Sequence, residues 1–154
     1  AIHQIWQAET KIKAEKARWH STASDKNLDH CRDKIQIYEC DLNDLSSILW
    51  VMRDVKHDLI FHLASHVNVL TSYKTPLSVI NNNVTITGNL LEAIRLSDFD
   101  PLVQLCSTSE VYGQVDPKNV PIKEDCPLNP TRPPYAVSKV VRTCWASPIT
   151  EATA

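Results

Sequence analysis

The chain has 154 residues, of which 43% are hydrophobic, and this length and composition suit one soluble globular domain with a buried core. The net charge is −2, with 16 basic and 18 acidic residues interspersed, so no basic tract indicates binding to nucleic acid or to an anionic membrane. No apolar run approaches the roughly 20 residues of a membrane span, and the N-terminal segment lacks the apolar core of a signal peptide. We therefore expect a cytoplasmic protein that binds a small, compact ligand.

The first third of the chain begins with an ambiguous segment. Residues 1–34 are polar and rich in charge, and "TKIKAEKARW" within them fits a short helix or a strand. "KIQIYECDL", residues 34–42, then predicts a strand because β-forming residues dominate it. "LNDLSSILWVMRDV", residues 42–55, follows with apolar side chains at helical spacing, so these two segments predict a βα unit.

The rest of the chain continues the alternation of strands and helices. "DLIFHLAS", residues 58–65, predicts a second strand, and "PLVQLCS", residues 101–107, predicts a third. A long helix is expected between them, over residues 75–96, with an apolar stripe of Leu77, Ile80, Val84, Leu91 and Ile94. After a Pro-rich loop at 115–134, another helix is expected to start near Tyr135. Such alternation predicts a parallel sheet covered on both faces.

Several residues could suggest a metal or a modification, but each has a simpler interpretation. His62 and His66 are four residues apart, yet a strand sends them into different surroundings, so we expect hydrogen-bonded histidines and no metal. Asn83 in "NVT" fits a glycosylation acceptor, which a cytoplasmic chain would not use. The five cysteines are odd in number and never spaced as CxxC, so neither a disulfide framework nor a zinc site is indicated.

The third predicted strand ends in four polar residues, Ser107, Thr108, Ser109 and Glu110. In parallel sheets covered by helices, ligands bind beyond the carboxyl ends of the strands. These side chains suit such a crevice, because burying each one without a partner would cost about 1–3 kcal/mol. On this stretch alone, an ordinary polar loop remains the alternative.

A second polar pair opens the last predicted helix, in "PYAVSK". Tyr135 and Lys139 are four residues apart, so they share one face of a helix. A free phenol titrates near pH 10, and a nearby cation is needed if Tyr135 is to act as a base near neutral pH, which Lys139 is placed to supply. A lone pair of this kind occurs by chance on many surface helices, whereas its combination with "STSEVYG" is much more specific.

The two motifs together resemble the extended short-chain dehydrogenase/reductase family, specifically its nucleotide-sugar 4,6-dehydratases and epimerases, from about Ile35 to Val141. The resemblance implies an α/β fold with a partial Rossmann-type, doubly wound parallel sheet. The chain has only two glycines, Gly88 and Gly113, and no GxGxxG, so we expect the sheet to lack the first strand and the glycine-rich loop. The expected organisation is a poorly assigned segment at 1–34, a partial NAD(P)-binding domain with the catalytic motif at 35–145, a tail at 146–154 and no substrate domain.

The resemblance also implies a cofactor, NADP, with NAD as the alternative. Asp41 in "YECDLNDL" matches the family's aspartate that reaches the adenine, and "IFHLAS" matches the strand that runs alongside the cofactor. Arg18 in "RWHS" matches a basic residue that could meet a 2′-phosphate. The residues implied in cofactor binding are Arg18, Asp41, Leu42, Leu63, Ala64, Ser65, Tyr135 and Lys139.

Among the subfamilies, the Thr-Ser-Glu run followed by Tyr-x-x-x-Lys is most similar to GDP-mannose 4,6-dehydratases. Thymidine-type dehydratases usually have Asp where this chain has Ser109, and epimerases generally lack a catalytic carboxylate at Glu110. The resemblance implies that Tyr135 takes the proton of the sugar C4 hydroxyl, that Thr108 and Lys139 assist it, and that Glu110 removes the C5 proton before water leaves from C6. The implied catalytic residues are Thr108, Ser109, Glu110, Tyr135 and Lys139.

Two alternatives remain open at this point. One is an epimerase or a reductase of the same family, since related reductases also keep a glutamate before "VYG". The other is a truncated domain without catalysis, because a chain that lacks the pyrophosphate cradle should bind the cofactor weakly and be inactive by itself. The expected partner is a nucleotide sugar, and a homodimer through the two long helices is a family expectation for the complete enzyme.

Overall fold

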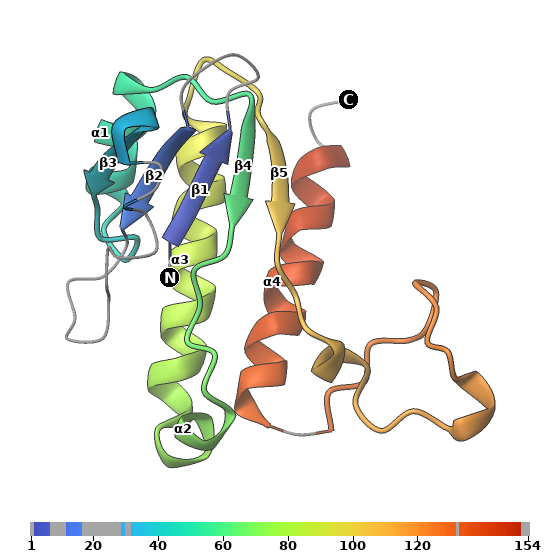
Figure 1. Ribbon diagram of the computed structural model, residues 1–154. Coiled ribbons are helices and arrows are strands. Elements are labelled where there is room, and N and C mark those ends of the chain that lie inside the picture. The colour runs from blue at the N-terminus through green and yellow to red at the C-terminus, as the bar shows by residue number, and fades with distance from the viewer. Residues whose placement is uncertain (1, 7–11, 17–28, 30–31, 132, 152–154) are drawn as a thin grey trace. The chain divides into compact units, whose positions relative to one another are not determined.

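The computed structural model describes residues 2–6, 12–16, 29, 32–131 and 133–151 (Figure 1). The chain divides into two compact units, which are described separately. Unit 1 contains Ala1–Ser65 and Thr85–Cys106, and unit 2 contains His66–Val84 and Ser107–Ala154.

Unit 1 is built on a five-stranded sheet in the order β3-β2-β1-β4-β5 (Figure 1). Its strands are β1 Ile2–Trp6, β2 Ile12–Lys16, β3 Ile35–Glu39, β4 Leu59–His62 and β5 Leu102–Leu105. The pairs β2–β3 and β4–β5 are parallel, whereas β1 is antiparallel to both of its neighbours. The order 3-2-1-4-5 is that of a Rossmann sheet, so the α/β prediction is confirmed.

The strand at the centre of this sheet, β1, differs from the sequence-based expectation. The sequence predicts a sheet without a first strand, but β1 fills the place between β2 and β4, in the opposite direction to the other strands. Only residues 7–11 separate β1 from β2, and parallel neighbours need a crossover of about a dozen residues or more. The short connection therefore forces β1 to run antiparallel. It also follows that part of the ambiguous segment 1–34 is strand, in β1 and β2.

Helices α1 (Leu45–Asp54) and α3 (Pro76–Arg95) confirm the predicted helices. Asp44 is the N-cap of α1, and its carboxylate accepts from the backbone N–H groups of Ser46 at 3.0 Å and Ser47 at 3.2 Å. These acceptors satisfy N–H groups that have no partner inside the helix, so the sequence "NDLSS" fixes where α1 begins.

The core of unit 1 lies where α1 and the second half of α3 pack on the sheet. Its buried members are apolar side chains of β3, α1, β4 and α3 and of the loops between them, with Ile48 and Val51 fully buried on α1 and Leu90 and Ala93 buried on α3. The apolar stripe predicted for α3 is only partly correct, because Leu77 is 73% exposed. Leu77 lies in the first turn of α3, which belongs to unit 2, so it is not part of the core of unit 1.

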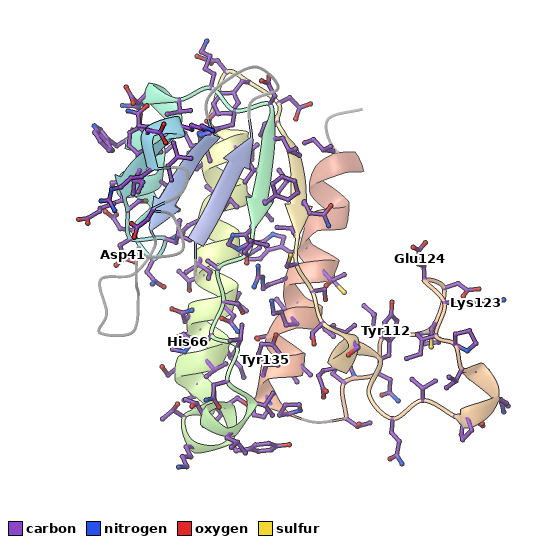
Figure 2. All side chains as sticks on the ribbon, viewed as in Figure 1. Asp41, His66, Tyr112, Lys123, Glu124 and Tyr135 are labelled. Carbon is purple, nitrogen blue, oxygen red and sulfur yellow. The ribbon has the colours of Figure 1, made fainter. Side chains whose placement is uncertain are left out.

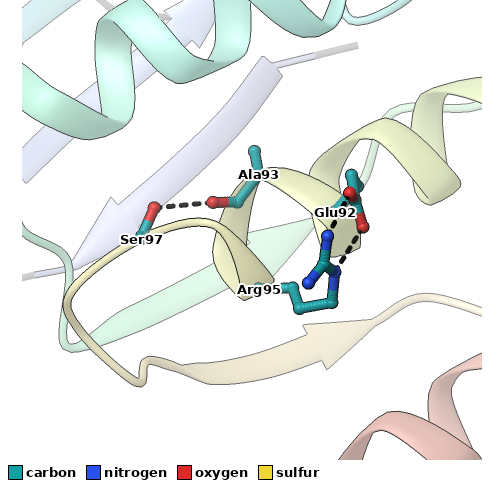
Figure 3. Close-up of polar contacts among 4 residues, drawn as sticks. All are labelled: Glu92, Ala93, Arg95 and Ser97. Atoms are coloured by element: carbon teal, nitrogen blue, oxygen red, sulfur yellow. Dashed lines mark hydrogen bonds and ion pairs between the residues drawn. The ribbon is translucent and has the colours of Figure 1, made fainter.

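The end of α3 is held by local polar contacts (Figure 3). The guanidinium of Arg95 donates to both carboxylate oxygens of Glu92, at 2.7 and 2.6 Å, and the Ser97 hydroxyl donates to the Ala93 carbonyl at 2.6 Å. The hydrogen bonds from Arg95 hold the pKa of Glu92 below its usual value. Positive charge in the last turn and a bonded carbonyl both favour a helix end at this position.

Unit 2 holds the remaining helices: α2 Val69–Lys74, the first part of α3, two 3₁₀ turns, η3 Ser109–Tyr112 and η4 Pro117–Asn119, and α4 Pro134–Glu151. Helix α4 begins where the sequence predicts a helix, but it continues into the segment expected as a tail, 146–154. Once a first turn has formed, each further residue adds a hydrogen bond at little cost, which favours this extension. No helix in the described part of the chain is both long and apolar enough to cross a membrane.

Candidate active site

The polar run after β5 forms a tight turn in unit 2. Thr108 has extended backbone angles and precedes the 3₁₀ turn η3, and its hydroxyl accepts from the Glu110 N–H at 3.4 Å. Gly113 ends the turn with φ at +61°, and a Cβ added there would lie 2.0 Å from the Asn129 carbonyl oxygen. Any other residue would be strained and would collide with the backbone. Glycine is therefore needed at position 113, where the chain turns directly after η3.

Tyr135 and Lys139 face the same way from the start of α4. Pro133 and Pro134 precede the tyrosine, and the Ala136 N–H donates to the Pro133 carbonyl at 2.8 Å, which closes the first turn. Tyr135 is 7% exposed and Lys139 is 3% exposed. The Lys139 Nζ lies 5.7 Å from the centre of the Tyr135 ring, within the range of a cation–π contact.

The electrostatics of Tyr135 differ from the sequence expectation. Burial raises the pKa of Tyr135 above its usual value and the charge of Glu110 raises it further, while the hydrogen bond from Thr108 and the charge of Arg142 lower it. The net direction is upward because burial disfavours the phenolate more than the other groups favour it. The shift therefore favours the protonated phenol, and Arg142 is the cation whose charge opposes it.

A buried polar network supports the backbone of Tyr135. The Asn83 side chain accepts from the His66 N–H at 2.6 Å and donates to the His66 carbonyl at 3.2 Å and to the Ser138 hydroxyl at 2.9 Å. The Ser138 hydroxyl donates to the Tyr135 carbonyl at 2.6 Å. Figure 2 labels His66 and Tyr135. This network fixes the first turn of α4.

The sequence did not reveal the role of Asn83. Its side chain is fully buried, so the glycosylation pattern "NVT" has no accessible acceptor in the folded chain. Asn83 is the last of three consecutive asparagines in α3, so residue type alone could not distinguish it from the exposed Asn81. Such a buried amide must have hydrogen-bond partners, and these come from residues distant in sequence.

Unit 1 holds the residues predicted to contact the adenosine part of the cofactor. Asp41 follows β3, is exposed, and its carboxylate accepts from the backbone and side chain of Asn43 at 2.9 and 3.1 Å (Figure 2). Leu42 is buried, and its carbonyl accepts from the Asn89 amide at 3.0 Å. Because β3 and β4 run in the same direction, Asp41 and Leu63 follow the same edge of the sheet.

The remaining predicted residues differ in their exposure to solvent. Leu63 is exposed, Ala64 is buried and Ser65 is half-buried after β4, and Ser109 is exposed in η3. His62 is buried and bonded to the Thr87 hydroxyl at 3.0 Å, so the expectation of a hydrogen-bonded core histidine is confirmed. Arg18 lies outside the described residues.

In unit 2, three of the other predicted catalytic residues, Thr108, Glu110 and Lys139, therefore lie near the phenol of Tyr135. The comparison with protein families agrees with these motifs: a family model described as GDP-mannose 4,6 dehydratase matches residues 3–153. The chain belongs to this family. It is a partial chain of the nucleotide-sugar dehydratase and epimerase group of extended short-chain dehydrogenases/reductases, as the resemblance implied.

Curated relatives of both activities match the chain. A UDP-glucose 4-epimerase of Lactobacillus helveticus is 37% identical over 108 residues, which cover 70% of this chain and 32% of the epimerase. A GDP-mannose 4,6-dehydratase of Vibrio cholerae is 36% identical over 102 residues, which cover 65% of this chain and 27% of the dehydratase. The chain thus spans about a third of the length of these relatives, and identities this similar do not separate the two activities.

Solved structures share the fold. The structure of RMD from Pseudomonas aeruginosa complexed with NADPH has a TM-score of 0.65 and 29% identity, with 72% of this chain and 38% of that chain covered. The UDP-glucose 4-epimerase from Bifidobacterium longum in complex with NAD+ and UDP has a TM-score of 0.75 and 25% identity, with 86% of this chain and 39% of that chain covered.

Proposed function

We propose that the protein containing this chain is an NADP-dependent nucleotide-sugar 4,6-dehydratase that acts on a GDP-mannose-type substrate. The observation that carries the proposal is the surroundings of the Tyr135 hydroxyl. Thr108 donates a hydrogen bond to it, Glu110 lies close enough for its charge to raise the pKa of Tyr135, and the Lys139 ammonium lies 5.7 Å from the ring centre. A proton acceptor, a hydrogen-bonding hydroxyl and a second carboxylate are the groups that oxidation followed by elimination needs.

In the first half of the proposed reaction, Tyr135 accepts the proton of the C4 hydroxyl. Thr108 hydrogen-bonds the same sugar oxygen and holds it in line with the phenolic oxygen. The Lys139 ammonium stabilises the phenolate and orients a ribose hydroxyl, since an ammonium can donate three hydrogen bonds. The product of this half is a ketone at C4.

In the second half, the ketone acidifies the C5–H bond, and Glu110 is the proposed base. Glu110 is exposed on η3, so its carboxylate is accessible to a sugar beside Tyr135. Glu110 takes the C5 proton, and the C–H electron pair forms the C5–C6 double bond as the C–O bond at C6 breaks. The leaving C6 hydroxyl takes this proton from Glu110 and departs as water, which returns Glu110 to its carboxylate form. This elimination distinguishes a dehydratase from an epimerase, which needs no base at C5.

The described residues fit a nicotinamide dinucleotide in two places. In unit 2, the buried Lys139 beside Tyr135 suits ribose hydroxyls, and in unit 1, the exposed Asp41 carboxylate keeps acceptor capacity beyond its two bonds to Asn43. When bound, this cofactor would supply the hydride acceptor and donor that oxidation at C4 and reduction at C6 require. We propose NADP, with NAD as the alternative, and Leu42, Leu63, Ala64 and Ser65 as further contacts.

A nucleotide-sugar 4-epimerase is the second candidate. It is favoured by the 37% identical UDP-glucose 4-epimerase, whose identity is no lower than that of the dehydratases. The two candidates share the proton transfer at Tyr135 and differ in the use of Glu110. A reductase of the same family would also use Tyr135 without elimination.

The test is turnover by the full-length gene product, supplied with GDP-mannose and NADP or with UDP-glucose and NAD. A dehydratase gives a product lighter by one water in mass spectrometry, and an epimerase gives an isomer of unchanged mass that chromatography separates. Tyr135→Phe should lower turnover by about 10²–10⁴-fold. Tyr73→Phe is the matched control, because Tyr73 is an exposed tyrosine on α2. Turnover retained in Tyr135→Phe would exclude both assignments.

Three further statements remain predictions. A catalytic NAD(P)-binding domain at 35–145 predicts that this chain binds NADP weakly and saturably, which the fluorescence of its four tryptophans can follow. A domain without catalysis, the remaining alternative, predicts no binding up to millimolar NADP or NAD. A homodimer of the complete enzyme would be detected by its mass in light scattering. A cytoplasmic location would be tested by cell fractionation.

A further inference from the structure

Arg142 extends the Tyr135–Lys139 face of α4 by a third residue. At about 100° per residue, positions i, i+4 and i+7 of a helix fall within about 60° of one another. Arg142 is 2% exposed, so its guanidinium is buried in unit 2 beside the two residues of the motif. Neither the sequence motif nor the proposed mechanism uses it.

Helix geometry favours an Arg142 side chain that leans toward the start of α4. Side chains of an α-helix lean toward its N-terminus, and the Cα atoms of residues 135 and 142 are about 10 Å apart along the axis. A fully extended arginine therefore carries its charge back over the turn of Lys139, toward Tyr135. Consistent with this direction, the charge of Arg142 lowers the pKa of Tyr135.

We infer that Arg142 is a positioning residue for proton transfer, whose buried charge stabilises the phenolate of Tyr135 and so sets the pH range in which Tyr135 accepts a proton. The inference rests on the proposed function only for its catalytic meaning. The other buried cation on this face is Lys139, whose Nζ lies over the Tyr135 ring at 5.7 Å from its centre.

The other groups near Tyr135 show why a second cation matters. On η3, Glu110 opposes the phenolate and Tyr112 is half-buried, while Thr108 before it favours the phenolate. On α2, the titratable side chains are Tyr73 and Lys74, both exposed. The positive charges buried in unit 2 among the described residues are therefore Lys139 and Arg142, both on α4.

A purely structural role for Arg142 makes a different prediction. Burying a guanidinium is costly, and replacing a buried charge by an apolar side chain of similar volume is often neutral or stabilising. If Arg142 serves the phenolate, Arg142→Met should fold and should change the titration of Tyr135. If it serves only packing, Arg142→Met should leave that titration unchanged.

The experiment is a pH titration of this chain labelled with ¹³Cζ-tyrosine, followed by NMR, with the Tyr135 signal assigned from Tyr135→Phe. We expect Arg142→Met to raise the pKa of Tyr135 by about one unit, the size expected for a charge several ångströms away at an effective dielectric constant near 20. Arg142→Lys should retain most of the wild-type value. Arg53→Met, an exposed arginine on α1, is the matched control and should not move it.

A Tyr135 pKa unchanged within about 0.2 units in folded Arg142→Met would overturn the inference, whatever the turnover. If Arg142→Met does not fold, Arg142→Gln and Arg142→Lys are compared, and equal Tyr135 pKa values in these two variants would overturn it equally. The NMR readout needs no substrate. A shift in the titration of Tyr135 without any turnover of the full-length protein would therefore support the positioning role of Arg142 and reject the proposed dehydratase function. In an active full-length protein, the pH at which kcat/KM rises should move by the same amount.

Discussion

The two units of this chain bury different kinds of side chain. The core of unit 1 is mainly apolar, from Leu42 after β3 to Ile48 and Val51 on α1, with His62 and Thr87 as a bonded polar pair. In unit 2 the buried residues include Ser72, Asn83, Ser138, Lys139 and Arg142. The burial of apolar area stabilises unit 1, whereas unit 2 uses its buried positions to orient polar groups.

This difference supports a candidate site in unit 2. Buried charges and amides cost free energy unless they are bonded, so they persist where they serve chemistry or specify one arrangement. Unit 2 carries Thr108, Glu110, Tyr135 and Lys139, and the polar network beneath them holds one backbone geometry. Substitutions in the apolar core of unit 1 should therefore change stability alone, whereas substitutions in unit 2 should also affect the groups around Tyr135.

The largest expected effect is a loss of turnover without a change in stability. Glu110→Gln should lower the formation of dehydrated product in the full-length protein by about 10²–10⁴-fold, because the amide cannot accept the C5 proton. The unfolding midpoint should stay unchanged, since Glu110 is exposed. Glu124→Gln, in the exposed loop before α4 (Figure 2), is the control. Unchanged dehydration in Glu110→Gln would favour the epimerase.

The next effect is on stability alone. Ile48→Ala removes a fully buried side chain from the core of unit 1 and should lower the free energy of unfolding by about 2–5 kcal/mol. Leu70→Ala, at an exposed leucine of α2, should change it by less than about 0.5 kcal/mol. Chemical denaturation measures both values. Amide hydrogen exchange would show whether the loss of stability is located in unit 1. Equal losses of stability in Ile48→Ala and Leu70→Ala would contradict the conclusion that the burial of apolar area stabilises unit 1.

A third prediction tests whether the polar interior of unit 2 is specific. Asn83→Ala leaves the Ser138 hydroxyl and the His66 backbone without their partner and should cost about 1–3 kcal/mol. Asn81→Ala, at an exposed asparagine of the same helix, is the matched control. The NMR signal of Tyr135 should shift in Asn83→Ala only. An Asn83→Ala protein as stable as Asn81→Ala would show that the network does not hold α4.

The smallest effect concerns pH and unit 1. Burial, and then the hydrogen bond and charge of Asp54, raise the pKa of Tyr38 from 10.0 to about 12. Because the folded state holds this proton more tightly, the contribution is complete below about pH 10 and is lost as the pH rises through about 12. Urea unfolding across this range should show a steeper loss of stability in the wild type than in Tyr38→Phe. Tyr73→Phe should follow the wild type.

Much of the architecture follows from local patterns. The strands β3, β4 and β5 and the helices α1, α3 and α4 coincide with apolar periodicity and cap residues such as Asp44, which act over a few neighbours. The place of β1 at the centre of the sheet could not be predicted, because "IHQIW" also pairs with β4, which is distant in the sequence. The exposure of Leu77 was also missed, because periodicity identifies the apolar face of a helix but does not show which parts of that face other elements cover.

The motifs "STSEVYG" and "PYAVSK" were enough to suggest the family by resemblance, and the family model that matches residues 3–153 agrees with them. Helical spacing also placed Tyr135 and Lys139 on one helix face. Only the tertiary structure decided that Asn83 and Arg142 are buried and that the pKa of Tyr135 is raised. Those properties depend on which side chains exclude water and which charges lie within a few ångströms. Desolvation and Coulomb interactions are set by distances between residues far apart in the chain, and these distances exist only after folding.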